Sequence, residues 1–262
     1  MIRLIDIQKS YDNGTKALKG VNLRIDDGEF VFLVGPSGSG KSTILKLITA
    51  EIAPTGGRLM VNGYNLNNIR PRQVPYMRRT LGVIFQDFRL IEKKTVRENL
   101  TFAMRAVGAS PREIRKRVPY VLELVGLDQK GDRKPNQLSG GEQQRVQLAR
   151  CLAQLWRDGA PQGWLFLDEP TSALDLYYQQ HLLRLLKRLT AGGQLHVCVV
   201  LHDLNLAALW ADRILLLHQG HLVAQGTPQE VIQQPVIHRW YGADVRLVQH
   251  PDNAVPQVYL AP

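Results

Sequence analysis

Apolar residues along the chain follow two different spacings, one typical of strands and one typical of helices. In residues 1–30 the apolar positions recur at period two, most regularly over residues 21–25, ahead of a turn at Asp26-Asp27-Gly28. Later stretches are short and continuously apolar, as expected for buried strands: residues 30–34, 81–85, 164–167 and 195–201. This pattern predicts an α/β protein in which several strands are buried on both faces.

Between Asp87 and about Arg150 the spacing becomes helical. Ser110 is followed by Pro111 and by Glu113, a combination that predicts a helix start closed by a capping box. The same signature occurs at Thr227. A further amphipathic helix is predicted after Asp175, with Leu182, Leu183, Leu185, Leu186 and Leu189 on its apolar face. Residues 213–217 and 221–224 predict two strands joined by a turn, and residues 240–262 are weakly patterned.

Composition narrows the possible partners. The chain has 262 residues and a formal net charge of +10, and none of its apolar runs approaches the ~20 residues that span a bilayer. Its N-terminus does not resemble a signal peptide, and the two cysteines, Cys151 and Cys198, lack metal-ligand spacing, which is typical of reduced core residues in a cytosolic protein. The basic charge fits nucleic acid, an anionic membrane surface or a solvated face, and no aromatic residues are interleaved with it as single-stranded nucleic acid would require.

A glycine-rich loop lies between the apolar run 30–34 and a helix-like segment. It matches G-x-x-x-x-G-K-[ST] in the strand, loop, helix setting that the pattern requires. Such a loop turns its main-chain N–H groups inward around phosphate oxygens at the N-terminus of the following helix. Lys41 would reach the β- and γ-phosphates, and Ser42 would ligate Mg²⁺. The expected nucleotide-binding residues here are Gly35, Pro36, Ser37, Gly38, Ser39, Gly40, Lys41, Ser42 and Thr43.

A second glycine-containing helix start follows about a hundred residues later. Ser139 precedes Gly140 and Gly141 and opens a predicted helix, which makes another anion site of the helix-N-terminus kind. One chain has no evident use for two phosphate cradles unless the second serves a neighbouring copy.

Polar residues also stand at the ends of predicted strands. Asp168 and Glu169 end the run 164–167, where open α/β sheets bind ligands. Asp168 is expected to hold Mg²⁺ and Glu169 to take a proton from a hydrolytic water. Gln86 and His202 end two further strands, and each alone would more often be a surface or structural residue. Tyr11, ahead of a turn, would stack on an adenine ring or simply pack.

In order and spacing, these motifs resemble the complete motif set of the ATP-binding-cassette (ABC) nucleotide-binding domains. The resemblance implies a P-loop ABC-ATPase fold with a mixed-sheet core, an antiparallel β subdomain and an inserted helical subdomain. Residues 1–86 and 151–262 would form the core, and residues 87–150 the helical subdomain. The signature that is specific to this family comprises Leu138, Ser139, Gly140, Gly141, Glu142 and Gln143.

The resemblance also implies a mechanism. Two copies would dimerise head to tail on MgATP, so that the phosphate loop of one and the signature of the other enclose each ATP. Catalysis would involve Glu169, His202, Gln86 and Lys41, and Mg²⁺ would be held by Ser42, Gln86 and Asp168. Tyr11 would stack the adenine, and Asp175 would line the dimer interface.

The subfamily resemblance changes along the chain. Residues 1 to about 145 look like the FtsE cell-division ATPases, through segments such as residues 11–18, 83–90 and 115–119. From about residue 146 onward, residues 146–150, 164–176 and 202–209 look like the HmuV ATPases of haem (hemin) importers. A crossover inside a shared motif is typical of a chimera of two homologues.

The sequence therefore predicts an ATP hydrolase that is peripheral on the cytoplasmic face of the cell membrane and drives an integral membrane subunit. That subunit would be FtsX-like or a haem permease. Two alternatives stay open: a nucleic-acid-linked ABC ATPase, although the long coiled-coil insertion of that class is missing and no nucleic acid is expected, and a chimeric cassette that folds and binds ATP without a physiological partner.

Overall fold

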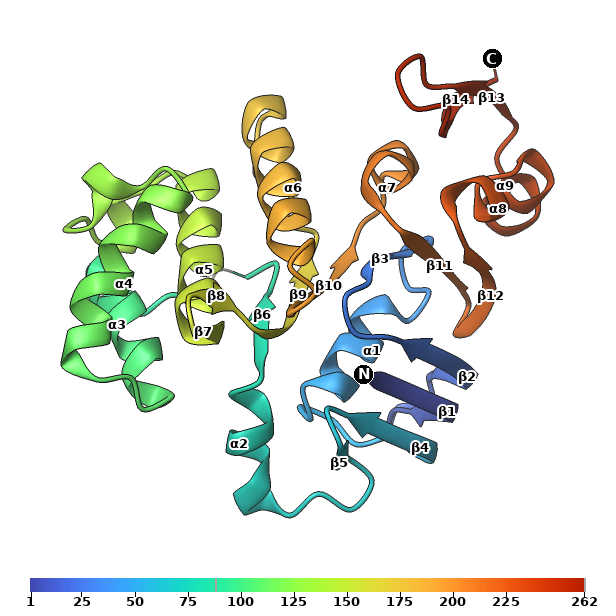
Figure 1. Cartoon of the computed structure of the whole chain (residues 1–262). Helices are drawn as coiled ribbons and strands as arrows, with labels where there is room; N and C mark the ends of the chain where they lie inside the picture. Colours follow the sequence, from blue (N-terminus) through green and yellow to red (C-terminus); the bar gives the residue numbers. More distant parts are fainter. Residues whose placement is uncertain (88, 262) are drawn as a thin grey trace. The chain divides into compact units, whose positions relative to one another are not determined.

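The computed structural model describes residues 1–87 and 89–261, so Phe88, which belongs to the FtsE-like segment 83–90, lies outside the described residues, as does Pro262. The chain forms two compact units (Figure 1). The first contains Met1–Met77 and Val197–Pro262, and the second contains Arg78–His196.

The N-terminal strands of the first unit form an antiparallel sheet with the order β2-β1-β4-β5. Its strands are β1 (Ile2–Ser10), β2 (Lys16–Ile25), β4 (Gly56–Val61) and β5 (Tyr64–Asn65). The pairing of β1 with β2 shifts register between Leu4 and Ile7, and Asp6 there has a positive φ of 49°. This bulge moves the buried face from Leu4 to Ile7, which is why the apolar period in this strand slips by one residue.

A second group of strands in the first unit carries the glycine-rich loop. β3 (Phe30–Val34) lies between β10 (Leu195–Val200) and β11 (Arg213–His218), parallel to both, and β12 (His221–Gly226) pairs antiparallel with β11. All five residues of β3 are buried. A parallel strand that is covered on both faces needs such a continuous apolar sequence, so the prediction of buried strands is confirmed here.

Helices of the first unit are short. They are α1 (Lys41–Ile48), α2 (Val74–Arg78, at the chain's passage into the second unit), α7 (Leu204–Trp210), α8 (Pro228–Val231) and α9 (Gln234–Tyr241). The capping box predicted at Thr227 is confirmed at the start of α8. Over residues 1–87 and 89–261, the helices lack the length and apolar character that a bilayer crossing requires.

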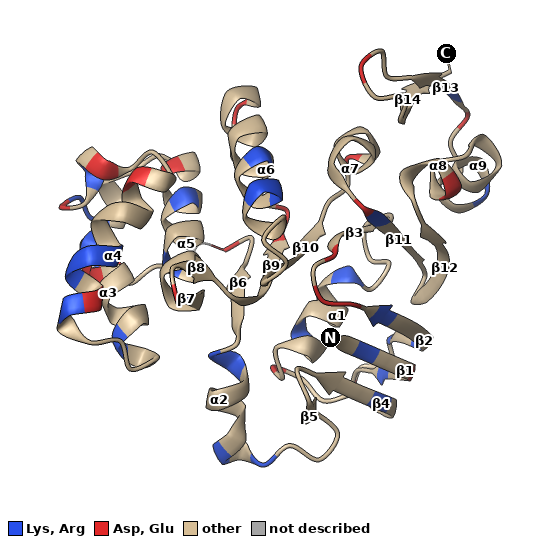
Figure 2. Ribbon diagram, in the orientation of Figure 1, with Lys and Arg blue, Asp and Glu red and all other residues tan. Residues whose placement is uncertain are grey.

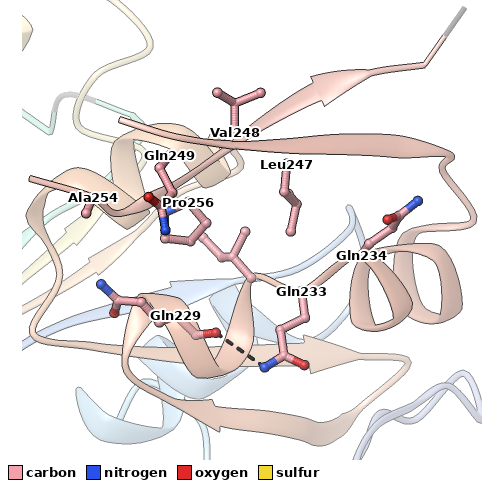
Figure 3. A pocket seen from close by; sticks show the side chains of 9 residues that line it. Gln229, Gln233, Gln234, Leu247, Val248, Gln249, Ala254 and Pro256 are labelled. Atoms are coloured by element: carbon pink, nitrogen blue, oxygen red, sulfur yellow. Dashed lines mark hydrogen bonds between the residues drawn. The ribbon is translucent and has the colours of Figure 1, made fainter. Parts of the chain in front are cut away.

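The C-terminal segment, weakly patterned in sequence, forms an antiparallel hairpin of β13 (Val245–Gln249) and β14 (Pro256–Leu260). Asn205 on α7 accepts from the Val258 N–H at 2.6 Å and donates to its carbonyl at 3.1 Å. A cleft of about 290 Å³ lies between the hairpin and α8–α9 (Figure 3), and none of the predicted site residues line it.

In the second unit, β6 (Leu81–Ile84) and β9 (Gly163–Asp168) pair in parallel. Its long helices are α3 (Val96–Ala106), α4 (Pro111–Leu124), α5 (Gly140–Leu155) and α6 (Leu176–Thr190). A small hairpin of β7 (Trp156–Arg157) and β8 (Ala160–Pro161), not predicted from sequence, follows α5. Lys and Arg positions, coloured blue on the ribbon in Figure 2, recur on these four helices.

Helix starts in the second unit are built alike. Capping boxes join Thr95 with Glu98 at α3, Ser110 with Glu113 at α4, and Ser139 with Glu142 at α5. The one predicted at Ser110 is confirmed. In the central part of α4, Val118, Val121 and Leu122 are buried.

Candidate active site

The glycine-rich loop of the first unit leads from β3 directly into α1. Gly35, Gly38 and Gly40 all have positive φ values, which side chains with a Cβ rarely adopt. A Cβ on Gly35 would lie 2.1 Å from the carbonyl oxygen of Leu217 on β11, so only glycine fits there. The loop ends at the N-terminus of α1, which is the positive end of the helix dipole.

Lys41 is the first residue of α1, and its side chain turns back into the loop. Its ammonium donates to the carbonyl oxygens of Gly35 at 2.7 Å and Pro36 at 2.8 Å, and lies 3.4 Å from Ser39 Oγ. The residue is only 5% exposed. A buried cation that is held by loop carbonyls can transfer these bonds to phosphate oxygens, which are stronger acceptors because they are charged.

Tyr11 lies close to the same loop. Its hydroxyl is 3.3 Å from Thr43 Oγ1, and the Lys9 ammonium lies 5.4 Å from the centre of its ring. Ser42 is exposed at the helix N-terminus. The first unit therefore brings together the phosphate loop and Tyr11, whereas the adenine contact of Tyr11 stays a prediction.

His202 follows β10, in the first unit, and is exposed. The next residue, Asp203, caps α7 by accepting from the N–H groups of Asn205 at 2.8 Å and Leu206 at 3.0 Å. This cap fixes the direction in which the chain leaves β10, and so the place of the histidine relative to α7.

In the second unit, Glu169 directly follows β9, whose last residue is Asp168. Glu169 has a left-handed backbone with φ of 50°, a conformation that stores strain in a residue other than glycine and that is concentrated at functional sites. Gln86 Nε2 lies 3.5 Å from the Glu169 carboxylate. The structure thus brings together two of the residues predicted from sequence, Gln86 and Glu169, at the ends of two paired strands.

The signature residues lie at the start of α5, also in the second unit. Ser139 Oγ accepts from the Glu142 N–H, and the Glu142 carboxylate accepts from the Ser139 N–H at 2.8 Å. This bond to the main chain lowers the pKa of Glu142 below its ordinary value, and the Lys130 ammonium, 3.3 Å away, adds to the effect. Gly141 packs closely on the loop between β9 and α6, since a Cβ on this glycine would lie 3.1 Å from the Ala173 carbonyl oxygen.

Asp175 ends that loop and caps α6. Its carboxylate accepts from the Tyr178 N–H at 2.9 Å. Within the same segment, Ser172 Oγ donates to the Glu169 carbonyl at 2.9 Å. Together with the Asp175 cap and the close contact of Gly141 with Ala173, this bond holds the segment from Glu169 to Asp175 against the start of α5.

Sequence reasoning missed two buried glutamines on α5. Gln144 Nε2 lies 3.4 Å from the Glu169 carbonyl oxygen, and Gln147 Nε2 lies 3.5 Å from the Phe85 carbonyl oxygen, next to Gln86. The periodicity of α5 places both on one face but gives no sign of what that face contacts, so only the three-dimensional structure reveals them.

Comparison with known proteins defines the class. The ABC transporter family model matches residues 18–172. The hemin import ATP-binding protein HmuV of Enterobacter cloacae is 45% identical over 241 residues, which cover 90% of this chain and 88% of that protein. The cell division ATP-binding protein FtsE of Streptococcus pneumoniae serotype 2 is 40% identical over 223 residues, which cover 85% and 94%.

Among solved structures, a dimeric post-hydrolysis state of the ATP-binding cassette MJ0796 bound to ADP and Pi is 39% identical, with a TM-score of 0.77, and the match covers 87% of this chain and 98% of that one. The fold is that of a P-loop ABC ATPase, as the sequence predicts. The chain belongs to the ABC transporter family, as an ATP-hydrolysing cassette.

Proposed function

We propose that this cassette binds MgATP between two head-to-tail copies, hydrolyses it with Glu169 as general base, and drives a membrane partner. The observation that carries the proposal is the strained Glu169, placed at the end of β9 with the amide of Gln86 3.5 Å from its carboxylate. A carboxylate that is held by an amide at a strand end is well placed to orient and deprotonate a water molecule.

The phosphates would lie in the loop of residues 35–43, with Lys41 on the β- and γ-phosphates and Tyr11 against the adenine. His202 would contact the γ-phosphate. The signature of the second copy, from Leu138 to Gln143, would close over the same ATP through the N-terminal end of α5. In this arrangement the positive ends of two helices would stabilise the negative charge that develops during phosphoryl transfer.

Mg²⁺ would be held by Ser42, Gln86 and Asp168, whose hydroxyl, amide and carboxylate oxygens are the ligands that this ion prefers. In residues 1–87 and 89–261 no cluster of three or more His, Cys, Asp and Glu side chains forms a metal site. A donor set of this kind fits an ion that is bound largely through nucleotide phosphates and needs only a few protein oxygens. When bound, Mg²⁺ neutralises phosphate charge.

The names of two relatives bear on the choice of partner. One is named for hemin import and the other for cell division, and each aligns over most of this chain. We infer a partner that is either a haem permease or an FtsX-like protein, and hence a position on the inner face of the cell membrane. We place the docking surface for this partner beside Gln86 and on the helical segment 87–150. Most of that surface belongs to the part of the sequence, up to about residue 145, that resembles FtsE, which supports the second partner.

The change of resemblance near residue 145 that the sequence suggests would fit a chimeric origin, with the junction in the shared signature region. A cassette built in this way would keep every residue of the ATP cycle, because both parents share those motifs. Its partner would be set by whichever parent supplies the docking surface.

The Glu169→Gln variant tests the general base. It keeps the size of the side chain and a polar contact with Gln86 but cannot accept a proton, so ATP turnover is expected to fall at least ~100-fold while ATP binding persists. Phosphate release and ATP affinity are measured in parallel. Glu123→Gln, an exposed position on α4, serves as the control and should turn over normally. Near-normal hydrolysis by Glu169→Gln would remove Glu169 from this role.

A further inference from the structure

Side chains of α5 cap one edge of β6. β6 ends its sheet, with β9 on one side only. On its other edge, three side chains of α5 donate to alternate carbonyl oxygens of the strand and the residue after it: Gln154 to Leu81 at 3.0 Å, Cys151 to Val83 at 3.5 Å, and Gln147 to Phe85 at 3.5 Å. Side chains of the helix thus donate the hydrogen bonds that a neighbouring strand would otherwise make, so these carbonyl groups have partners.

Helix and strand are also in close van der Waals contact. A Cβ on Gly82 would lie 3.0 Å from Cys151 Cβ and 3.1 Å from Leu155 Cδ1, so this glycine permits the close approach of α5. The row of contacts is therefore part of a tightly packed interface within the second unit.

The last contact of the row, and one further contact of α5 beyond it, reach the main chain at the proposed catalytic residues. Gln147 holds the carbonyl of Phe85, the residue before Gln86, and Gln144, three positions earlier on the same helix face, holds the carbonyl of Glu169. Gln147 is fully buried and Gln144 is 6% exposed. One glutamine of α5 thus contacts the main chain next to Gln86, and the other contacts the main chain of Glu169.

These two glutamines are poorly suited to stabilise the fold. In the part of the chain that the structure describes, the Oε1 atoms of Gln144 and Gln147 are both buried without a hydrogen-bond partner. A buried amide oxygen that is left unpaired costs free energy, which offsets much of what the bond donated by the same side chain contributes to stability. Polar groups kept at a cost to stability are typical of functional positions.

We propose that Gln147 and Gln144 are positioning residues for ATP hydrolysis: through the main chain they hold Gln86 and Glu169 in register with each other and with the signature at the start of α5. The inference rests on the roles proposed above for Gln86 and Glu169. It makes α5 the common support of the residues that act on one ATP and of the signature that acts on the ATP of the partner copy.

The test compares Gln147→Met with Gln154→Met. Both replace an amide on the same helix face by an apolar side chain of similar length, and both remove a contact with the same strand, but only Gln147 contacts the residue next to Gln86. Gln147→Met is expected to lower kcat by ~10-fold, because small displacements of reacting groups are costly, with KM for ATP changed less than about threefold and Tm not lowered. Gln154→Met should keep kcat.

Gln144→Met provides a second variant that reaches Glu169 instead of Gln86, and it should lower kcat in the same way. The proposal is overturned if Gln147→Met and Gln144→Met both keep kcat within about twofold of the parent. It is also overturned if Gln154→Met loses as much kcat as they do, since the effect would then be general loosening of α5. Failure of the proposed function is a separate result: Glu169→Gln would then hydrolyse ATP normally.

Discussion

At the scale of single residues, the glycine-rich loop and the end of β9 both adopt backbone conformations that residues with a side chain rarely adopt. Gly35 cannot carry a side chain because of Leu217, and Glu169 adopts a left-handed backbone. The motif pattern alone identified these positions, because the loop's glycines and the acidic pair after an apolar run can be recognised directly in the sequence. The contacts of Gln144 and Gln147 could not be predicted from the sequence, since their partners are main-chain oxygens 25 and 62 residues away.

Lys41 allows a direct prediction at this scale. In Lys41→Ala the loop loses its buried cation, and ATP affinity should fall by roughly 10- to 100-fold or more, the value of one or two charge-assisted hydrogen bonds. Lys46→Ala is the matched control, since Lys46 is an exposed lysine on the same helix. Titration calorimetry with ATP measures both, and equal affinities in the two variants would remove Lys41 from the phosphate site.

At the scale of elements, the sequence predicted best those features that depend on neighbouring residues. Capping boxes and continuously buried strands are local and were found. The β13–β14 hairpin was missed because its outer edge is paired with Asn205 on α7, 53 residues from Val258, and its own alternation is weak. α2 was missed because only one of its residues, Met77, is buried.

The three capping boxes of the second unit predict a pH dependence. Main-chain hydrogen bonds lower the pKa values of Glu98, Glu113 and Glu142 below 4.5. A carboxylate whose pKa is lower in the folded state stabilises the fold above its unfolded pKa, and this contribution is lost as the pH falls through the folded value. The caps of α3, α4 and α5 should therefore weaken below about pH 4.5.

Gln can replace Glu in a capping box without titrating, so the triple variant Glu98→Gln, Glu113→Gln, Glu142→Gln should lose less Tm than the parent between pH 6 and pH 3.5. The single variant Glu123→Gln, which caps none of the described helices, should behave like the parent. Thermal unfolding followed by circular dichroism gives the comparison, and parallel curves for triple variant and parent would contradict the account.

At the scale of the whole molecule, charge is unevenly distributed. Residues 78–196 contain 20 of the 33 Lys and Arg but only 12 of the 23 Asp and Glu, and so carry +8 of the net charge of +10. The signature lies in this unit and the phosphate loop in the other, so a head-to-tail dimer would place the positive unit of one copy at the nucleotide of the other. Negatively charged ATP would then favour dimerisation by neutralising this charge.

The central question is therefore whether two copies of the chain dimerise when they bind ATP. The measurement that tests this is the mass in solution of Glu169→Gln, in which bound ATP is preserved, with and without MgATP. We predict one chain without nucleotide and twice that mass with MgATP, and a single chain again when Ser139→Arg is added, because a bulky cation would block the signature while ATP binding persists. A monomer under both conditions, with ATP bound, would contradict the shared nucleotide site.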